Sequence, residues 1–272
     1  MPTAHAKVDL LTEAMMDVRR TARWYWGKLK RVDRPLKFIV NGQSVTVQHS
    51  GSIANRNAIS QCFIDHQYEL PNTGVDHRHK VRELYAKIIR DRGIPLIIDA
   101  GANIGASALW FRAQYPEAMI VAIEPATDNL KWLRVNCAGA RFDIRGAAIG
   151  PEDGETTLTD PGAGADSYRT GGSGLPGYAV PVVSVATILA QHPGTVPFIL
   201  KADIEGAEQH LFRGDPAVLA QFPIIAVEPH DWMLPGEGTA LSFFGFHTAA
   251  KRDFSYHSEN IFSLDYAKLA ER

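Results

Sequence analysis

The stretch that most constrains the fold of this chain runs from Leu96 to Gly105, with the sequence LIIDAGANIG. A short apolar run ends in Asp99, a turn containing Gly101 follows, and an amphipathic segment then extends from Ala106 to Tyr115. A strand, a glycine turn and a helix start in this order are typical of an α/β sheet that forms a nucleotide pocket at the carboxyl ends of its strands. Glycines let a ligand approach the backbone closely, and a helix start offers unpaired N–H groups. We therefore expect the rest of the chain to complete this pocket.

Downstream of Pro95, short apolar segments alternate with helix-like segments, which predicts a doubly wound, mainly parallel sheet. A helix is expected from Glu205 to Arg213, and the aromatic alternation between Phe243 and Leu264 suits a final antiparallel pair. We assign residues 93–272 to this domain and residues 1–92 to an N-terminal extension. The further expected strands are Met119–Glu124, Phe142–Ile149, Ala179–Ser184, Phe198–Asp203 and Ile224–His230.

The N-terminal extension shows one clear turn. Asn-Gly lies between two β-rich arms in Leu36–Gln48 and predicts a hairpin. Two helices are expected, over Asn55–Leu70 and Asp76–Arg92. The basic and aromatic stretch Val8–Lys30 predicts a docking helix, with a membrane-surface or acceptor-binding helix as the alternative. Within it, Trp24–Trp26 is where we expect a subunit contact.

Charge and composition narrow the classes of partner. Lys and Arg number 28 and Asp and Glu 30, a formal charge of −2, which gives no global argument for nucleic-acid binding. The two cysteines, Cys62 and Cys137, are not in a CxxC spacing and suggest neither a disulfide framework nor a zinc site. The chain has no apolar run long enough for a membrane span and its start lacks a signal-peptide core, so we expect a cytoplasmic protein.

Polar side chains follow four of the expected strands, at the points where these strands end. They are Asp99, Glu124, Asp203, and Glu228 with His230. Because ligands bind at the carboxyl edge of open α/β sheets, these groups are expected to converge. Glu124, about 25 residues beyond Asp99, lies where an acid accepts hydrogen bonds from the ribose hydroxyls of an adenosine ligand.

The first loop also discriminates between cofactors. A dinucleotide site requires Gly-x-Gly-x-x-Gly, whereas here the sequence is Gly101-Ala-Asn103-Ile-Gly105, directly downstream of the anionic Asp99. A carboxylate beside a phosphate cradle is electrostatically unfavourable, and the chain has no Gly-Lys-Ser motif of the Walker type. A ligand that carries an ammonium and a sulfonium suits acidic strand ends. These features favour S-adenosylmethionine over NAD.

Two motifs resemble those of the FkbM-type methyltransferases, a family of the class I superfamily. The first is Asp99-Ala-Gly-Ala-Asn-Ile-Gly105 and the second, more specific one is Lys201-Ala-Asp-Ile-Glu-Gly-Ala-Glu208, and the resemblance covers roughly residues 95 to 265. It implies a seven-stranded Rossmann-like sheet with an antiparallel last strand, S-adenosylmethionine as methyl donor, and transfer to a hydroxyl of a small molecule or glycan, such as a sugar or polyketide. The residues that would line the cofactor pocket are Asp99, Gly101, Asn103, Gly105, Glu124 and Asp203.

A hydroxyl acceptor needs in-line placement and a group that takes its proton. The candidates for this catalysis are Asp203, His230, Glu228 and Glu205. Lys201 lies two positions before Asp203, on the same side of the strand, where it could keep Asp203 ionised or orient the acceptor. Glu205 could instead cap a helix. Glu208 could be a surface acid or an acid in the layer behind the site.

Several alternatives stay open at this point. Asp203, Glu205, Glu228 and His230 could together hold a divalent metal ion, but their spacing is not a metal signature and we expect no metal site. N-methylation, a non-catalytic cofactor-binding protein and a Rossmann dehydrogenase are the rival functions. The Gly- and Pro-rich stretch Pro161–Gly177 predicts a mobile loop, either a lid or a linker, in which Asp166–Arg169 could touch a ligand.

Overall fold

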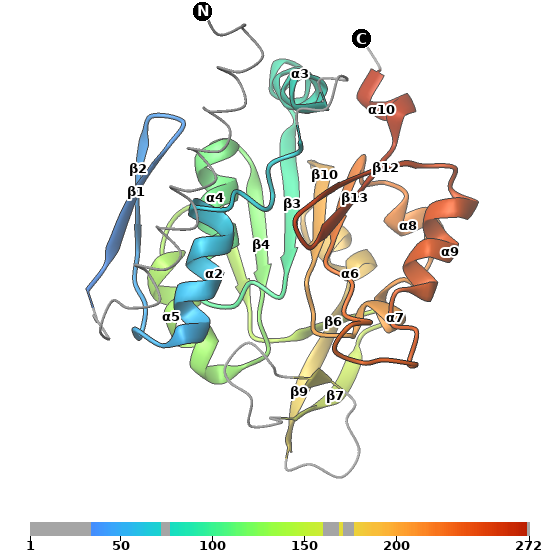
Figure 1. Cartoon of the computed structure of the whole chain (residues 1–272). Coiled ribbons are helices and arrows are strands. Elements are labelled where there is room, and N and C mark those ends of the chain that lie inside the picture. The colour runs from blue at the N-terminus through green and yellow to red at the C-terminus, as the bar shows by residue number, and fades with distance from the viewer. Residues whose placement is uncertain (1–33, 72–76, 160–168, 171–176, 271–272) are drawn as a thin grey trace, which may run out of the picture.

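The computed structural model describes residues 34–71, 77–159, 169–170 and 177–270. Their main feature is a seven-stranded sheet (Figure 1) in the order β12-β13-β11-β10-β3-β4-β5. The five strands from β11 to β5 are parallel, whereas β13 is antiparallel to β11 and to β12. This confirms the doubly wound, mainly parallel sheet. The strands are β3 Ile94–Ala100, β4 Met119–Ile123, β5 Phe142–Arg145, β10 Thr195–Ala202, β11 Ile224–Val227, β12 Asp253–His257 and β13 Asn260–Leu264.

Both faces of the sheet are covered, and consecutive residues of β3 show why. Ile97 belongs to the hydrophobic cluster that contains α2, α4 and α5, whereas Leu96 and Ile98 belong to the cluster on the other face, with α6 to α9. All three side chains are fully buried, and each such burial contributes about 1.5–3 kcal/mol. The helices are α2 Ile53–Phe63, α3 His77–Arg90, α4 Ala106–Gln114, α5 Thr127–Asn136, α6 Val185–Gln191, α7 Glu208–Leu211, α8 Pro216–Leu219, α9 Leu241–Ala249 and α10 Tyr266–Ala270.

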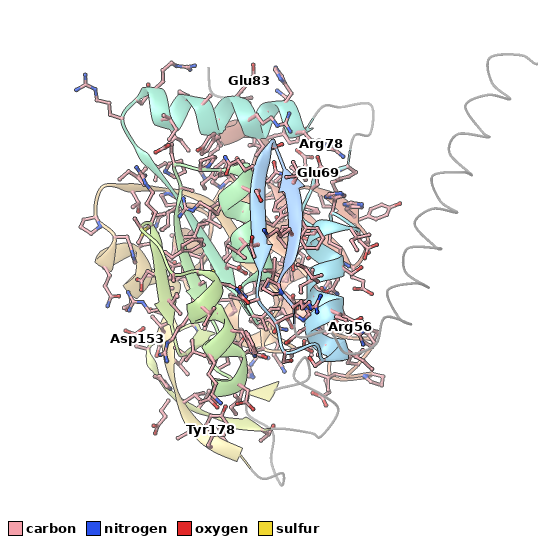
Figure 2. All side chains as sticks on the ribbon, turned by 90° about the vertical axis from the view of Figure 1, so that its left-hand side faces the viewer. Arg56, Glu69, Arg78, Glu83, Asp153 and Tyr178 are labelled. Atoms are coloured by element: carbon pink, nitrogen blue, oxygen red, sulfur yellow. The ribbon has the colours of Figure 1, made fainter. Side chains whose placement is uncertain are left out.

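The described part of the N-terminal extension packs against the sheet domain. The hairpin of β1 (Leu36–Val40) and β2 (Gln43–Val47) forms as expected, with Asn41 and Gly42 at φ 48° and 75° in its turn. Its buried residues share one cluster with α2 and α4. Arg78 of α3 pairs with Glu69 at 2.8 Å (Figure 2). The domain boundary at residue 92 stays a prediction, and Val8–Lys30 lies outside the described residues.

Three expected elements differ from those observed. The strand Phe142–Ile149 is two strands, because the chain leaves the main sheet after β5 and β6 (Ala148–Gly150) enters a four-stranded sheet. The aromatic segment from Phe243 is the helix α9, in which Phe243 and Phe246 are buried on one face. The helix expected over Asn55–Leu70 ends at Phe63, since His66 has φ 51°. The four-stranded sheet also contains β7 Gly154–Thr159, β8 Arg169–Thr170 and β9 Gly177–Ser184.

Among the helices of the described ranges, none is both long and apolar enough to cross a bilayer.

Candidate functional site

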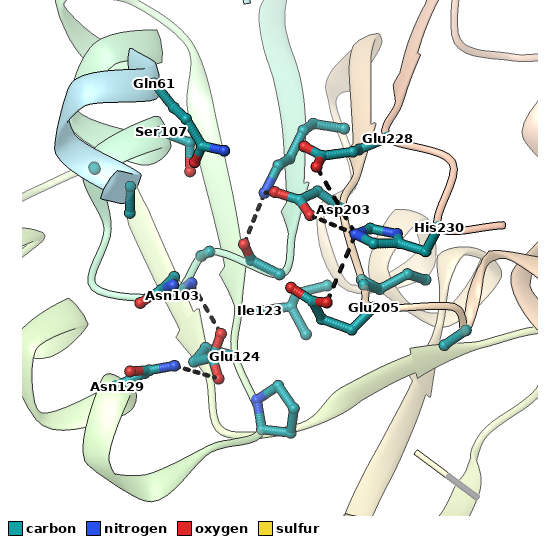
Figure 3. Close-up of a pocket in the computed structure, with 18 of the residues that line it drawn as sticks. Gln61, Asn103, Ser107, Ile123, Glu124, Asn129, Asp203, Glu205, Glu228 and His230 are labelled. Carbon is teal, nitrogen blue, oxygen red and sulfur yellow. Dashed lines mark hydrogen bonds and ion pairs between the residues drawn. The ribbon is translucent and has the colours of Figure 1, made fainter. Parts of the chain in front are cut away.

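A cavity of about 440 Å³ lies at the carboxyl ends of β3, β4, β10 and β11 (Figure 3), within the range typical of ligand pockets. The four strand ends that the sequence singled out therefore do converge. Asp99 and Gly105, by contrast, do not line the cavity. The predicted site residues that do line it are Gly101, Asn103, Glu124, Lys201, Asp203, Glu205, Glu228 and His230.

Gly101 is required by the contact between β3 and β10. Its φ is 75°, and a Cβ atom at this position would lie 1.7 Å from the carbonyl oxygen of Asp203. The sequence suggested that this glycine lets a ligand approach. The structure shows instead that it lets the backbone of a neighbouring strand end approach.

Glu124, which follows β4, also lines the cavity. Its Oε2 accepts a hydrogen bond from the backbone N–H of Asn103 at 2.9 Å, and its Oε1 accepts one from the N–H of Ala126 at 2.9 Å. Burial raises the pKa of this carboxyl to about 7, although these two hydrogen bonds oppose the rise. The carboxylate is thereby fixed at the rim of the cavity, where its remaining lone pairs can accept hydrogen bonds from a ligand.

Asp99 and Lys201 lie beneath the glycine loop. Oδ1 of Asp99 is 3.2 Å from Nζ of Lys201, and its Oδ2 accepts a hydrogen bond from Oγ of Ser107 at 2.6 Å. Nζ of Lys201 also donates to the carbonyl of Gly101 at 2.7 Å and lies 3.4 Å from Oδ2 of Asp203. Burial would lower the pKa of Lys201, but the charges of Asp99 and Asp203 raise it. Of the two expected roles for Lys201, the geometry favours the one that places its positive charge beside Asp203.

Glu208 contacts the Nδ1 side of the His230 ring. The imidazole Nδ1 and Oε1 of Glu208 are 2.9 Å apart, and the same oxygen accepts a hydrogen bond from the N–H of Ile204 at 3.0 Å. Glu208 is completely buried, so the interpretation of a surface acid is wrong and the alternative, an acid behind the site, holds. The carboxylate leaves Nδ1–H as the donor, which fixes the orientation of the ring.

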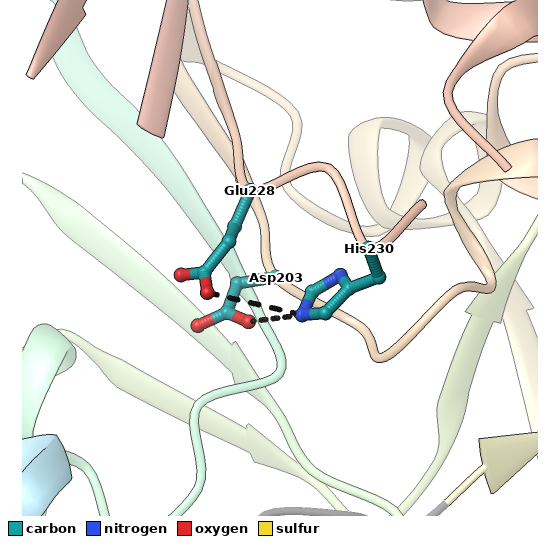
Figure 4. Close-up of side chains that lie close together, drawn as sticks. All are labelled: Asp203, Glu228 and His230. Carbon is teal, nitrogen blue, oxygen red and sulfur yellow. Dashed lines mark ion pairs between the residues drawn. The ribbon is translucent and has the colours of Figure 1, made fainter. Parts of the chain in front are cut away.

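The other imidazole nitrogen faces three carboxylates. Nε2 of His230 lies 3.7 Å from Oδ1 of Asp203, 3.7 Å from Oε2 of Glu205 and 3.9 Å from Oε1 of Glu228 (Figures 3 and 4). Burial would lower the pKa of His230, but the hydrogen bond and charge of Glu208 and the charges of Asp203 and Glu205 raise it to about 9. Burial and the charge of Asp203 raise the pKa of Glu228 to about 8. This cluster therefore attracts positive charge.

Glu205 does not begin a helix. Its φ is 56° and that of Gly206 is 96°, whereas α7 begins only at Glu208. The left-handed backbone at these two residues forms a sharp turn. Glu205 thus faces the cavity from a loop, so the expectation that a helix starts at Glu205 is wrong, and so is the alternative in which Glu205 caps that helix.

Some lining residues were not predicted from the sequence. Tyr68 is buried, and its hydroxyl donates a hydrogen bond to Oδ2 of Asp203 at 3.3 Å. Gln61 and Cys62 come from α2, and Trp232 follows His230 closely in the chain. The first three belong to the extension, which matches no motif, so no signal in the sequence marks them.

A family model described as the methyltransferase FkbM domain matches residues 99–257, more than half of the chain. The chain belongs to this family. These residues therefore form a methyltransferase domain, and the sheet described above has a Rossmann-like fold. The resemblance of the two motifs to FkbM methyltransferases is confirmed.

Other comparisons give a short match and several distant ones. Over 32 residues the chain is 56% identical to the methyltransferase sdnD of Sordaria araneosa, and this match spans 12% of each protein. A precorrin-6y C5,15-methyltransferase from Geobacter metallireducens is similar with 11% identity and a TM-score of 0.36, over 74% of this chain and 94% of its own. A putative caffeoyl-CoA O-methyltransferase from Staphylococcus aureus is similar with 9% identity and a TM-score of 0.40, over 79% and 92%.

Proposed function

We propose that this FkbM methyltransferase transfers a methyl group to a hydroxyl of a small molecule or glycan, and that the cavity described above holds both donor and acceptor. S-adenosylmethionine supplies, when bound, an electrophilic methyl group on a positively charged sulfur. The observation that carries the choice of a hydroxyl is the group of three carboxylates around Nε2 of His230, at the wall of the cavity.

The donor half of the cavity suits an adenosine ligand. The loop at Gly101 and Asn103 presents backbone, and Glu124 presents a carboxylate that two backbone N–H groups hold in place. Such a fixed acceptor is suited to the paired hydroxyls of a ribose. We infer that these residues bind the nucleoside part of the donor, while Asp99 and Lys201 stabilise the loop from beneath.

The acceptor half lies on the side of β10 and β11. A hydroxyl is a weak nucleophile until its proton is removed as the new C–O bond forms, whereas a neutral amine attacks with its own lone pair. Asp203, Glu228 and His230 supply groups that exchange protons at this wall. The pKa values of Glu228 and His230 are raised to about 8 and about 9, so the proton-accepting forms of both groups increase as the pH rises from 7 to 9.

The test measures binding and turnover separately. Calorimetry with S-adenosylhomocysteine should show binding at sub-millimolar concentration, and product analysis on panels of hydroxyl and amine acceptors should show methyl ethers. H230A should lower turnover by about 10²–10⁴-fold with the affinity for S-adenosylhomocysteine little changed. The absence of binding would refute the donor assignment. Near-normal turnover of both D203A and H230A on the true acceptor, or N-methylated products only, would refute transfer to oxygen.

A further inference from the structure

One carboxylate oxygen from each of Asp203 and Glu228 and one imidazole nitrogen from His230 lie within 4.8 Å of one another (Figure 4). We propose that these three side chains bind one divalent cation. The catalytic use of this cation rests on the proposed function, but its binding does not. From the sequence, a metal ion at these residues and Glu205 was only an alternative and no metal site was expected, because the ligands come from two strand ends and share no motif spacing.

The distances suit a shared ion. Metal–ligand bonds to imidazole nitrogen and carboxylate oxygen are about 2.0–2.2 Å, so neighbouring ligand atoms of one cation are about 3 Å apart and opposite ones about 4.2 Å. Nε2 of His230 is 3.7 Å from the Asp203 oxygen and 3.9 Å from the Glu228 oxygen. These separations are too long for hydrogen bonds and fall between the two values for a coordinated ion. Small rotations of the side chains complete the site.

Glu228 gives independent support. Its side chain is 8% exposed, and Nε2 of His230, which pairs with it, lies 3.9 Å from its Oε1, too far for a hydrogen bond. A buried carboxylate without a hydrogen-bond donor is costly, so native structures normally pair it with a cation or a metal ion. In Figure 4 the Glu228 carboxylate points toward His230 and Asp203, and the ion would lie between the three side chains.

Glu208 completes the arrangement as a positioning residue. Metal-binding histidines almost always donate their second ring N–H to a carboxylate or carbonyl, which fixes the ring and directs the other nitrogen at the metal. His230 meets this condition, with Nδ1 2.9 Å from Oε1 of the fully buried Glu208.

The excess of acidic residues in the cavity also favours a bound cation. Among the described residues that line it, Lys201 is the only lysine or arginine, and it is already close to Asp99 and Asp203. The acids that line the cavity outnumber its one lysine and its histidine, His230, so a divalent cation is favoured there. The acids that line the cavity are Glu124, Asp203, Glu205, Glu228 and Glu259.

The cation would act on the acceptor. A hydroxyl oxygen that takes an open coordination position becomes more acidic. Because Asp203, Glu228 and His230 are then occupied by the cation, the O–H proton of the acceptor passes instead to the carboxylate of Glu205, the oxygen forms its bond to the methyl carbon, and the C–S bond of the donor breaks. Two carboxylates with one imidazole suit a first-row transition ion, because carboxylate ligands favour Mn²⁺ and imidazole favours the later ions of that row.

The experiment uses Mn²⁺ alone as the probe. The full chain, freed of metal with a chelator, is titrated with Mn²⁺, and the free ion is counted by electron paramagnetic resonance. We expect saturable binding of one ion per chain, with nitrogen coupling from one imidazole. E228Q and H230Q should each weaken binding at least tenfold, and E208Q by about 10- to 100-fold. The matched control is H192Q, because His192 is also a mostly buried histidine beside a carboxylate, 3.1 Å from Asp143, and this variant should bind Mn²⁺ normally.

Folding and donor binding are measured on the same samples. Thermal denaturation identifies variants that fail to fold, and D203N replaces any such variant. Absence of saturable binding, or binding that E228Q, H230Q and D203N leave unchanged, overturns the metal site. S-adenosylhomocysteine binding and full turnover in the chelator, without Mn²⁺ binding, would refute the cation and leave the proposed function intact. Mn²⁺ binding without S-adenosylhomocysteine binding would refute the proposed function and leave the cation site intact.

Discussion

Lys201 and Asp99 occupy paired positions on the neighbouring strands β10 and β3, and Nζ of the lysine lies 3.2 Å from Oδ1 of the aspartate. Neither side chain is more than 1% exposed. The same ammonium binds the carbonyl of Gly101 and approaches Asp203. One buried cation thus joins the strand end that precedes the donor loop to the strand end that faces the acceptor.

Loss of this cation should destabilise the protein strongly. K201M leaves buried carboxylates without their counter-charge, and the expected loss in the free energy of unfolding is about 3–5 kcal/mol. Chemical denaturation measures it. The control K131M removes an exposed pair, Lys131–Asp128, and should cost less than about 1 kcal/mol. Equal stability of K201M and K131M would contradict the account of the buried network.

Gly101 should tolerate no side chain. G101A places a methyl group against the carbonyl of Asp203 at a positive φ, so the two strand ends must separate. We expect a lower melting temperature and at least a tenfold loss of S-adenosylhomocysteine affinity. G139A is the control, because a Cβ atom at Gly139 meets nothing within 4 Å, and its stability should change by less than about 0.5 kcal/mol. A G101A protein that binds like the unmodified chain would show that the contact is not required.

Donor affinity should depend on pH through Glu124. Its pKa in the ligand-free protein is about 7, so the carboxyl is mostly protonated at pH 6 and mostly ionised at pH 8. The ionised form is the better acceptor for ribose hydroxyls, so binding favours loss of the proton and affinity rises with pH. Calorimetry should show about a tenfold increase from pH 6 to pH 8. E124Q should bind more weakly and show no such trend. A flat profile for the unmodified protein would refute this role of Glu124.

Tyr68 should affect turnover more than folding. Y68F removes the hydroxyl that donates to Oδ2 of Asp203 and keeps the ring in place. A hydrogen bond to a charged group contributes about 1.5–3 kcal/mol, which corresponds to a loss in kcat/KM of about 10- to 100-fold. Steady-state kinetics on the acceptor measures it. Y115F is the control, since Tyr115 packs on the rings of Tyr85 and Phe198, away from the cavity. Unchanged kinetics for Y68F would show that Asp203 does not need this donor.

The sheet and the positions of its polar strand ends followed from the sequence, because both depend on local patterns. The run from Leu96 to Ile98 is apolar throughout, as a strand buried on both faces must be. A carboxyl edge is common to all parallel strands, so Asp99, Glu124, Asp203 and Glu228 had to lie at one edge. The family motifs then identified the chemistry of that edge.

What the sequence could not give depends on contacts between distant segments. The burial of Glu208 is set by His230, 22 residues later, so the spacing within α7 suggested only a surface or supporting acid. Tyr68 meets Asp203 across 135 residues. Gly101 was interpreted by its flexibility, whereas its contact with the Asp203 carbonyl depends on how two strands pair. The helix α9 could not be predicted either, because its four closely spaced aromatic and glycine residues fit a strand and a helix equally well.

The two halves of the cavity differ in how the chain builds them. The donor half comes from a single run, from Gly101 to Asn129, whereas the acceptor half gathers Gln61, Tyr68, Asp203, His230 and Trp232 from well-separated parts of the chain. A substitution in the turn after His230, where the Trp232 side chain is 69% exposed, therefore changes the acceptor wall and leaves the donor wall untouched. If the cavity works as proposed, selection can alter the acceptor one residue at a time while donor use stays constant, which makes this turn the natural starting point for evolving new acceptor preferences in the laboratory.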